Sequence, residues 1–354
     1  MLKGKVKQIV KEIEQKRSKG DIVNLRSHLE NSYEATPEKL YKELNINPMK
    51  TTVSQLMSLD EDTKWLFPEI VRDAIAVGLG FIPFISDIIM KEENIRSKSM
   101  SMPYLDFSGM KTTKGKKLTP GSTIQEDTIK VGEKIVTTHK FGKGIKVPYE
   151  SVKYASLNLL SSFFTGVGSR LQRDLNAAAV DVLINGDNGK DEDGNSVNSS
   201  AAEIGVENTS NKVAFKDYLR ATIRLSKIGR PATSLLGDEA QTLEVMQWDE
   251  FKKRYTGQAD TKLTMKTPAP VSVDGFVSDD VSSDKLLVLS KQFAMIQITS
   301  QGLMVESDKI IARQLHEAVA SIITTFGIVN RNARVLIDGG TAFTAKGFPV
   351  WMNY

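Results

Sequence analysis

The feature that most constrains this sequence is a long series of apolar residues, spaced three and four apart, that ends in an Asn-Gly pair. The residues on this spacing are Leu160, Phe163, Phe164, Val167, Leu171, Leu175, Ala178, Val182 and Leu183. The spacing places them on one face of an α-helix, and Gly186 stands where helices commonly end. We therefore predict a helix over about 149–185, of which 162–183 alone would measure roughly 33 Å.

The segment before this helix is long, polar and basic. Residues 109–146 carry nine Lys against Glu126, Asp127 and Glu133. The part from 111 to 121 is rich in Thr, Gly and Pro, which form turns and loops. Such a segment has little to bury by itself, and a loop of this size is usually functional or stabilised by a partner. We expect an extended loop over 108–146.

The first sixty residues predict a string of short elements. Residues 2–19 form an amphipathic pattern whose apolar face consists of Val6, Ile9, Val10 and Ile13. A helix this short and this charged needs a partner to be stable. Farther on, Thr36-Pro37-Glu38 has the order of an N-cap, an N1 proline and an acidic first turn, so it predicts the start of another helix.

Helical and strand patterns alternate in the rest of the chain, which predicts an α+β fold. Residues 213–256 predict a helix, a strand at 233–236, and helices that start at Asp238 and Asp249. Residues 258–338 are rich in strand patterns. Helical spacing competes there with β-branched residues, and we expect a strand from about Ala318. Residues 339–354 form a tail that begins with two glycines and carries four aromatic residues.

No local motif for catalysis, a cofactor or a metal stands out. The chain has no Cys, and its three His (His28, His139 and His316) lack the spacing of a metal site. The segment 109–116 has its second Gly one place late for a phosphate-binding loop, and no Ser or Thr follows its Lys. We predict a protein that is not an enzyme and that has no cofactor.

Three further features have simple structural interpretations. Gly166-Val167-Gly168 lacks the third Gly of a dinucleotide motif and lies in the predicted helix, where it favours close approach of another helix. Asp187, Asp191 and Asp193 offer oxygen ligands, but the pattern of a calcium-binding EF-hand loop fails, which favours a solvated turn. The most apolar stretch, 74–90, is too short and too interrupted to predict a membrane span.

The order of these parts resembles that of the major capsid proteins of tailed bacteriophages. Trp65-Leu66-Phe67-Pro68-Glu69-Ile70 resembles the entry from the N-terminal arm of those proteins into their body. Residues 104–146 resemble their extended hairpin loop, and Val147-Pro148-Tyr149-Glu150 resembles the segment before their long spine helix. Leu183-Ile184-Asn185-Gly186-Asp187 is similar to the end of that helix, and Asn332-Ala333-Arg334-Val335-Leu336 to the return into the peripheral domain.

The resemblance implies a fold of the Hong Kong 97 type. It implies an arm (1–64), a peripheral domain (65–107, 147–212 and 326–338) with a spine helix at about 149–185, an extended loop (108–146), an axial domain (213–325) and a C-terminal tail (339–354). It also implies hexamers and pentamers of the chain that tile an icosahedral head around double-stranded DNA. The head would be assembled in the cytoplasm of the host bacterium, with portal, scaffolding and decoration proteins as partners and no membrane.

The arm and the loop are the parts that most need a neighbouring subunit. We expect the apolar face of the arm (Val6, Ile9, Val10 and Ile13) and the lysines of the loop (Lys111, Lys114, Lys116, Lys117 and Lys130) to make contacts between subunits. For each single lysine, simple solvation is the stronger alternative. Association would then bury apolar surface that one copy leaves exposed.

Three other functions stay open. An encapsulin, which is a cellular nanocompartment, would share the fold and carry a groove for cargo. A basic nucleic-acid-binding protein is the second, although the net charge is only +4 and the basic stretch contains a single aromatic residue, Phe141. A soluble enzyme is the third, and it would need a concave polar site.

Overall fold

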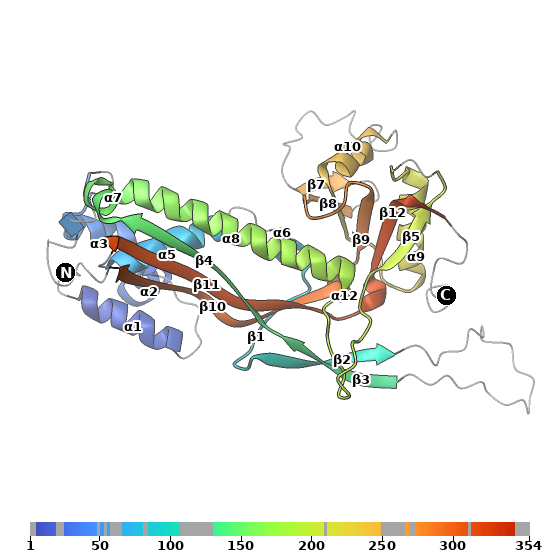
Figure 1. Cartoon of the computed structure of the whole chain (residues 1–354), viewed down its shortest axis with the longest axis horizontal. Helices are drawn as coiled ribbons and strands as arrows, with labels where there is room; N and C mark the ends of the chain where they lie inside the picture. The colour runs from blue at the N-terminus through green and yellow to red at the C-terminus, as the bar shows by residue number, and fades with distance from the viewer. Residues whose placement is uncertain are drawn as a thin grey trace, which may run out of the picture. The chain divides into compact units, whose positions relative to one another are not determined.

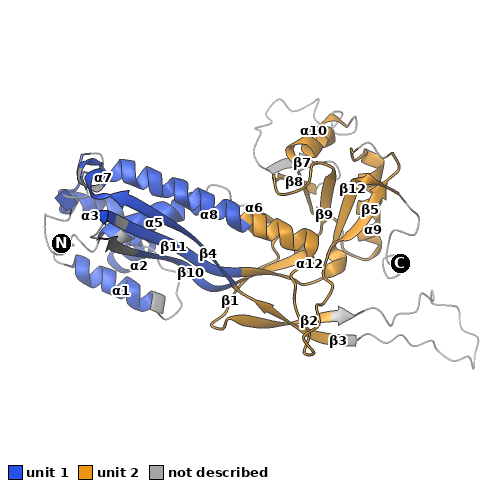
Figure 2. Cartoon of the chain, in the orientation of Figure 1, with its two compact units in different colours: residues 1–83, 139–175, 299–324 blue, residues 84–138, 176–298, 325–354 orange. Residues whose placement is uncertain are grey.

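The structure is a computed structural model in which helices and sheets are combined (Figure 1). It describes residues 5–18, 25–47, 50–52, 55–56, 66–80, 84–106, 130–208, 211–248, 266–269, 273–310 and 313–343. The chain divides into two compact units (Figure 2). The first comprises residues 1–83, 139–175 and 299–324, and the second comprises 84–138, 176–298 and 325–354. The predicted α+β fold class is confirmed.

The first unit combines short N-terminal helices with one long helix and a sheet. Its helices are α1 (Val6–Ser18), α2 (Leu25–Tyr33), α3 (Pro37–Glu43), α5 (Leu66–Leu79), α7 (Tyr149–Tyr154) and α8 (Leu157–Asn185) as far as residue 175. Its strands are β4 (His139–Pro148) and parts of β10 (Met295–Ile310) and β11 (Leu315–Ile328). β11 lies between β10 and β4 and pairs antiparallel with β4.

Thr36 starts α3 as the sequence predicts. Its hydroxyl accepts a hydrogen bond from Lys39 N at 3.4 Å, and Pro37 occupies the first turn. The side chain thereby satisfies a backbone donor that the helix itself leaves without a partner. The predicted N-terminal helix is also present, as α1.

The predicted helix over 149–185 is interrupted, which corrects the sequence analysis. α7 ends at Tyr154, and Ala155 takes an extended conformation. Ser156 pairs instead with Thr52 in an isolated antiparallel bridge, and Leu157 N donates to Thr51 O. Pairing with the N-terminal segment thus breaks the helix where its own periodicity gives no sign of a break.

α5 and α8 approach each other closely at two glycines. A Cβ atom on Gly168 would lie 2.2 Å from Ile75 O, and one on Gly78 would lie 2.1 Å from Thr165 O. Real Cβ atoms do not come so close to a backbone oxygen, so both positions require glycine. The expected helix approach at Gly168 is therefore present, whereas a Cβ on Gly166 would meet no atom within 4 Å.

The second unit is built around a six-stranded sheet of order β5-β12-β9-β6-β8-β7. These strands are β5 (Ala202–Val206), β12 (Arg334–Ala342), β9 (Lys285–Leu289), β6 (Ser234–Gly237), β8 (Val273–Val277) and β7 (Lys266–Ala269). The unit also contains α6 (Phe84–Ile88), β1 (Glu92–Asn94), α9 (Phe215–Lys227), α10 (Glu239–Gln247), α12 (Lys291–Ala294) and the short 3-10 helix η4 (Arg331–Ala333). Tyr218, Ala221 and Leu225 of α9 pack into a core with buried strand residues such as Val288 and Val335.

A two-stranded hairpin also belongs to the second unit. β2 (Ser99–Asp106) pairs antiparallel with β3 (Lys130–Thr137), in a register that sets Met102 opposite Lys134 and Tyr104 opposite Gly132. A Cβ on Gly132 would lie 2.6 Å from the Tyr104 ring. The aromatic ring therefore covers the glycine across the strands.

The contacts group parts of the chain differently from the predicted domains. Residues 326–338, expected with the peripheral domain, supply most of β12, which pairs with β5 and β9 in the six-stranded sheet. Residues 299–324, expected in the axial domain, belong to the first unit because β11 pairs there with β4. The strand expected from Ala318 is β11, and β12 continues through the two glycines at which the tail was expected to begin.

Candidate functional site

The lysines predicted to contact a neighbour lie mostly outside the described residues. This is the case for Lys111, Lys114, Lys116 and Lys117, so their contacts between subunits stay a prediction. Lys130 is the first residue of β3, and its side chain is not described. The structure does describe the base of the loop, which is the β2–β3 hairpin.

The apolar face of α1 is covered by the chain itself. Val6, Ile9, Val10 and Ile13 are buried, and three of the four belong to the core of the first unit. That core also includes Leu29 of α2 and apolar residues of α3 and α5. In this structure the partner of the face is therefore intramolecular, and the expected contact of the face with a neighbouring subunit stays a prediction.

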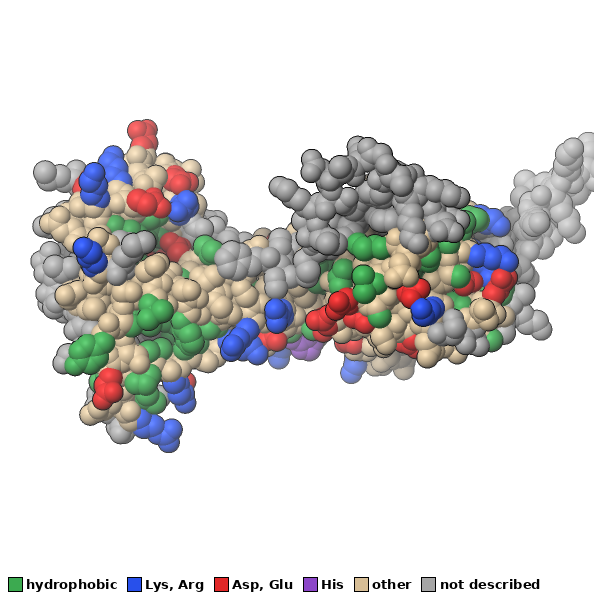
Figure 3. Space-filling view, turned by 90° about the horizontal axis from the view of Figure 1, so that it is seen from above, with side chains coloured by type: hydrophobic (Ala, Val, Ile, Leu, Met, Phe, Trp, Pro, Cys, Tyr) green, Lys and Arg blue, Asp and Glu red, His purple; other side chains and the backbone are tan. Residues whose placement is uncertain are grey.

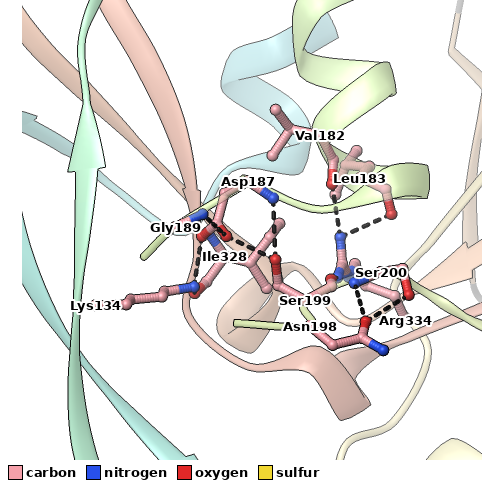
Figure 4. Close-up of polar contacts among 10 residues, drawn as sticks. All are labelled: Lys134, Val182, Leu183, Asp187, Gly189, Asn198, Ser199, Ser200, Ile328 and Arg334. Carbon is pink, nitrogen blue, oxygen red and sulfur yellow. Dashed lines mark hydrogen bonds and ion pairs between the residues drawn. The ribbon is translucent and has the colours of Figure 1, made fainter. Parts of the chain in front are cut away.

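A buried ion pair fixes the base of the hairpin to the end of α8 (Figure 4). Lys134 Nζ of β3 donates to Asp187 Oδ2 at 2.5 Å and to Ile328 O at 2.7 Å. Ile328 N donates to the same Asp187 oxygen at 2.8 Å. The two charged side chains are 2% and 0% exposed, so each replaces the hydration of the other.

The end of α8 is shaped to deliver Asp187 to this position. Gly186 has a φ of +95°, in the left-handed region that favours glycine, and a Cβ there would lie 2.6 Å from Ser199 Oγ. Ser199 Oγ donates to Asp187 Oδ1 at 2.6 Å, and Gly189 N donates to the same oxygen at 3.3 Å. Each Asp187 oxygen thus accepts two hydrogen bonds from the protein. A cation held by Asp187, Asp191 and Asp193 would have to displace these hydrogen bonds from Asp187.

Arg334, the first residue of β12, binds the same turn from inside the second unit. It is fully buried, and its guanidinium donates to Val182 O at 3.0 Å, to Leu183 O at 2.7 Å and to Ser199 O. The final carbonyls of a helix have no partner within the helix, and a cation is favourable at that end. Arg334 therefore caps α8 and holds the segment that carries Ser199.

The electrostatics agree with a fixed pair. Burial acts to raise the pKa of Asp187, but the charge of Lys134 and the hydrogen bonds outweigh it, so the pKa is lowered. Burial lowers the pKa of Lys134, with Asp187 opposing the change. Burial also lowers the pKa of Arg334 to about 9, and the guanidinium stays protonated at neutral pH. Asp187 thus interacts electrostatically with two buried basic side chains, those of Lys134 and Arg334.

Apolar and backbone contacts complete the anchor of the hairpin. Met102 and Val136 pack on Ile296 and Ile298 at the start of β10. On the other side, Ile135 and Lys190 exchange backbone hydrogen bonds of 2.7 and 3.2 Å. Together with the ion pair, these contacts hold a hairpin that has only two strands of its own, an arrangement that is marginally stable in isolation.

Sequence reasoning missed Lys134, Asp187 and Arg334 as a cluster. In the sequence Lys134 is one of nine lysines in a basic stretch, and Asp187 and Arg334 stand out only as a possible cation ligand and as parts of two segments that resemble the capsid family. One signal is available in the sequence. Lys134 and Val136 are two positions apart, so in a strand they lie on the same face, and the apolar Val136 suggests that this face is buried. The pairing of residues so distant in the chain had no signal in a single sequence.

The described residues show no group of three or more His, Asp or Glu that could hold a metal ion. His28 is buried against Glu12, with 3.1 Å between His28 Nε2 and Glu12 Oε2, in the packing of α1 on α2. His139 is exposed, and the side chain of His316 is not described. No helix in the described part of the chain is long and apolar enough to cross a bilayer.

A comparison with protein-family models identifies the kind of protein. A family model described as phage capsid protein matches residues 131–341, which is more than half of the chain. This match includes Lys134, Asp187 and Arg334. No curated protein sequence matches the chain.

Solved structures show the same fold at low sequence identity. A virus-like particle from Pyrococcus furiosus is 13% identical, with 76% of this chain and 97% of that chain covered and a TM-score of 0.50. The capsid of a native GTA particle is 12% identical, with 72% and 89% covered and a TM-score of 0.50. A structure of Microbacterium phage Oxtober96 is 8% identical, with 73% and 90% covered and the same TM-score.

Proposed function

The chain belongs to the phage capsid protein family, and we propose that its copies form hexamers and pentamers that tile the icosahedral head of a tailed phage around double-stranded DNA. The family match makes it a structural protein of the virion. It also favours a phage head over the cellular nanocompartment considered above. The fold proposed is the Hong Kong 97 type, and the proposed role is assembly without catalysis.

The anchored hairpin is the observation that supports assembly most directly. Its two strands are held at their base by the buried pair of Lys134 and Asp187 and by the apolar contacts of Met102 and Val136. A hairpin with so little core of its own gains stability when a neighbour covers it. Closed symmetry then repeats each such contact many times over the shell.

The remaining assignments follow the same proposal. Residues 1–64 form an arm, 108–146 the extended loop, α8 the spine, and the six-stranded sheet with α9 and α10 the axial part. The loop lysines meet acidic surfaces of a neighbour, and the packaged DNA is contacted without sequence preference. Portal, scaffolding and decoration proteins are further partners, and the head is assembled in the cytoplasm of the host.

Two lysine variants test whether the hairpin base serves assembly. Lys134→Met removes the buried partner of Asp187. Lys143→Met removes the partner of Asp174 in an exposed ion pair of 2.8 Å and serves as the matched control. We expect purified Lys143→Met to form shells as the unmodified chain does, and Lys134→Met to form few or none. The assay is sedimentation followed by electron microscopy, at a temperature where circular dichroism shows both variants folded. Equal yields of shells from the two folded variants would exclude a role of the hairpin base.

A further inference from the structure

α8 presents a stripe of exposed side chains that changes from apolar to basic along the helix. Leu159 is 63% exposed and Phe163 is 53% exposed, and both are large apolar residues. Gly166, Arg170 and Arg173 follow on the same face, since all five positions fall within about 100° around a helix of 3.6 residues per turn. From Leu159 to Arg173 the stripe measures about 21 Å.

Another exposed aromatic residue, Tyr154, ends α7 shortly before α8 begins. Tyr154 is 74% exposed, more than any other large apolar residue described. Figure 3 shows a group of hydrophobic side chains on the face seen from above, with Lys and Arg side chains next to it. Exposed apolar residues gathered in this way mark sites of interaction, whereas single ones do not.

No contact among the described residues explains why position 166 is a glycine. Glycine is among the weakest helix formers, and the glycines Gly78 and Gly168 are required by the contact between α5 and α8. A Cβ on Gly166 would instead point into open space. The absence of a side chain there leaves the middle of the stripe open, which lets another backbone approach α8 from outside.

The basic half of the stripe has free charges. Within the described residues, neither Arg170 nor Arg173 takes part in an ion pair, and both are exposed. Asp174, one residue on, is already paired with Lys143 of β4. A partner that covers the stripe therefore has to offer apolar side chains at one end and carboxylates at the other.

We propose that this stripe of α8 is the docking site for an acidic amphipathic helix of another protein. A helix of about 14 residues matches its length, and recognition of this kind uses apolar anchors at helical spacing. Double-stranded DNA fits less well, because it offers phosphates along its whole length and no apolar surface for Leu159 and Phe163. A second copy of this chain cannot bring the apolar face of α1, since that face is buried and its helix is basic. The inference does not rest on the shell proposed above.

Binding of designed peptides tests the proposal. The probes are fluorescent helical peptides of about 18 residues with a leucine face and glutamates near one end or the other, which covers both orientations. The control peptides carry lysine in place of each glutamate. We expect saturable binding of an acidic peptide to the purified full chain, weakening as salt rises, and no binding of the lysine peptides.

Three variants locate the binding. Phe163→Gln with Leu159→Gln, and Arg170→Glu with Arg173→Glu, are each expected to raise Kd by about tenfold or more. Gly166→Gln is expected to weaken binding while leaving the fold intact, because the added side chain fills the open position and favours the helix. Circular dichroism of each variant shows that it remains folded.

Several results would overturn the proposal. They are a failure of every acidic peptide to bind, equal binding of the lysine peptides, or binding that the three variants leave unchanged. Self-association of the chain that the same variants abolish would assign the stripe to a second copy. Binding of duplex DNA that Arg170→Glu with Arg173→Glu abolishes, without peptide binding, would assign it to nucleic acid.

Discussion

Lys134 Nζ donates a hydrogen bond to Asp187 Oδ2 at 2.5 Å, although 53 positions separate the two residues and both side chains are buried. The pair joins the base of the β2–β3 hairpin to the turn that ends α8. Arg334 holds the same turn from β12. One polar cluster thus ties together three segments of the second unit.

The ion pair predicts a strongly coupled pair of mutations. Lys134→Met leaves the Asp187 carboxylate buried without its cation, and we expect a loss of about 3–5 kcal/mol in the free energy of unfolding. Lys134→Met combined with Asp187→Asn should cost clearly less than the sum of the single changes, because no uncompensated charge remains. Urea unfolding followed by circular dichroism measures all three variants. Additive costs would show that the two residues do not interact.

The lowered pKa of Asp187 predicts a dependence of stability on pH. The unfolded carboxyl titrates near about pH 3.9, and the folded one titrates lower. The ionised group therefore stabilises the fold fully above about pH 4, and this contribution is lost as the pH falls through the folded value. The free energy of unfolding of the unmodified chain should therefore exceed that of Asp187→Asn by less at about pH 3 than at about pH 5. A difference that stays constant over this range would contradict the assignment.

Two glycines of α8 predict opposite responses to the same change. Gly168→Ala places a Cβ against the backbone of Ile75, so the free energy of unfolding should fall by about 1–3 kcal/mol. Gly166→Ala meets no atom, so it should raise that free energy by up to about 1 kcal/mol. Thermal unfolding of the two variants provides the comparison, with each serving as the control of the other. Equal shifts in Tm would show that α5 does not pack on α8 at Gly168.

The buried face of α1 predicts that the N-terminal helix stabilises the monomer. Ile13→Ala should cost about 2–4 kcal/mol, because it leaves a cavity in the core of the first unit. Leu159→Ala, at an exposed position, should change the stability by no more than about 0.5 kcal/mol. Both are measured on unassembled chain at low concentration. If Ile13→Ala left the free energy of unfolding unchanged under those conditions, the burial of this face within the monomer would be contradicted, and a contact between subunits would be favoured.

The sequence predicts best those features that a few adjacent residues determine. Thr36 caps α3 because the cap, the proline and the acidic residue act within one turn. The end of α8 was predicted because Gly186 is the residue that tolerates its backbone angles. The apolar periodicity likewise predicts most of the length of α8, and it predicts which face of α1 is apolar and which is polar.

Features that depend on distant contacts were beyond a single sequence. The break at Ala155 arises from pairing between Ser156 and Thr52. The position of β12 between β5 and β9 depends on strand pairing across much of the chain. Lys134 looked like any other lysine of a basic segment, because only its burial beside Asp187 distinguishes it.

The central claim, that this chain builds a closed capsid shell, is tested most directly by cryo-electron microscopy of the purified full-length protein. The account predicts closed icosahedral shells made of hexamers and pentamers, with the β2–β3 hairpin of each subunit lying against a neighbour. A chain that stays a monodisperse folded monomer across concentration and salt would contradict it.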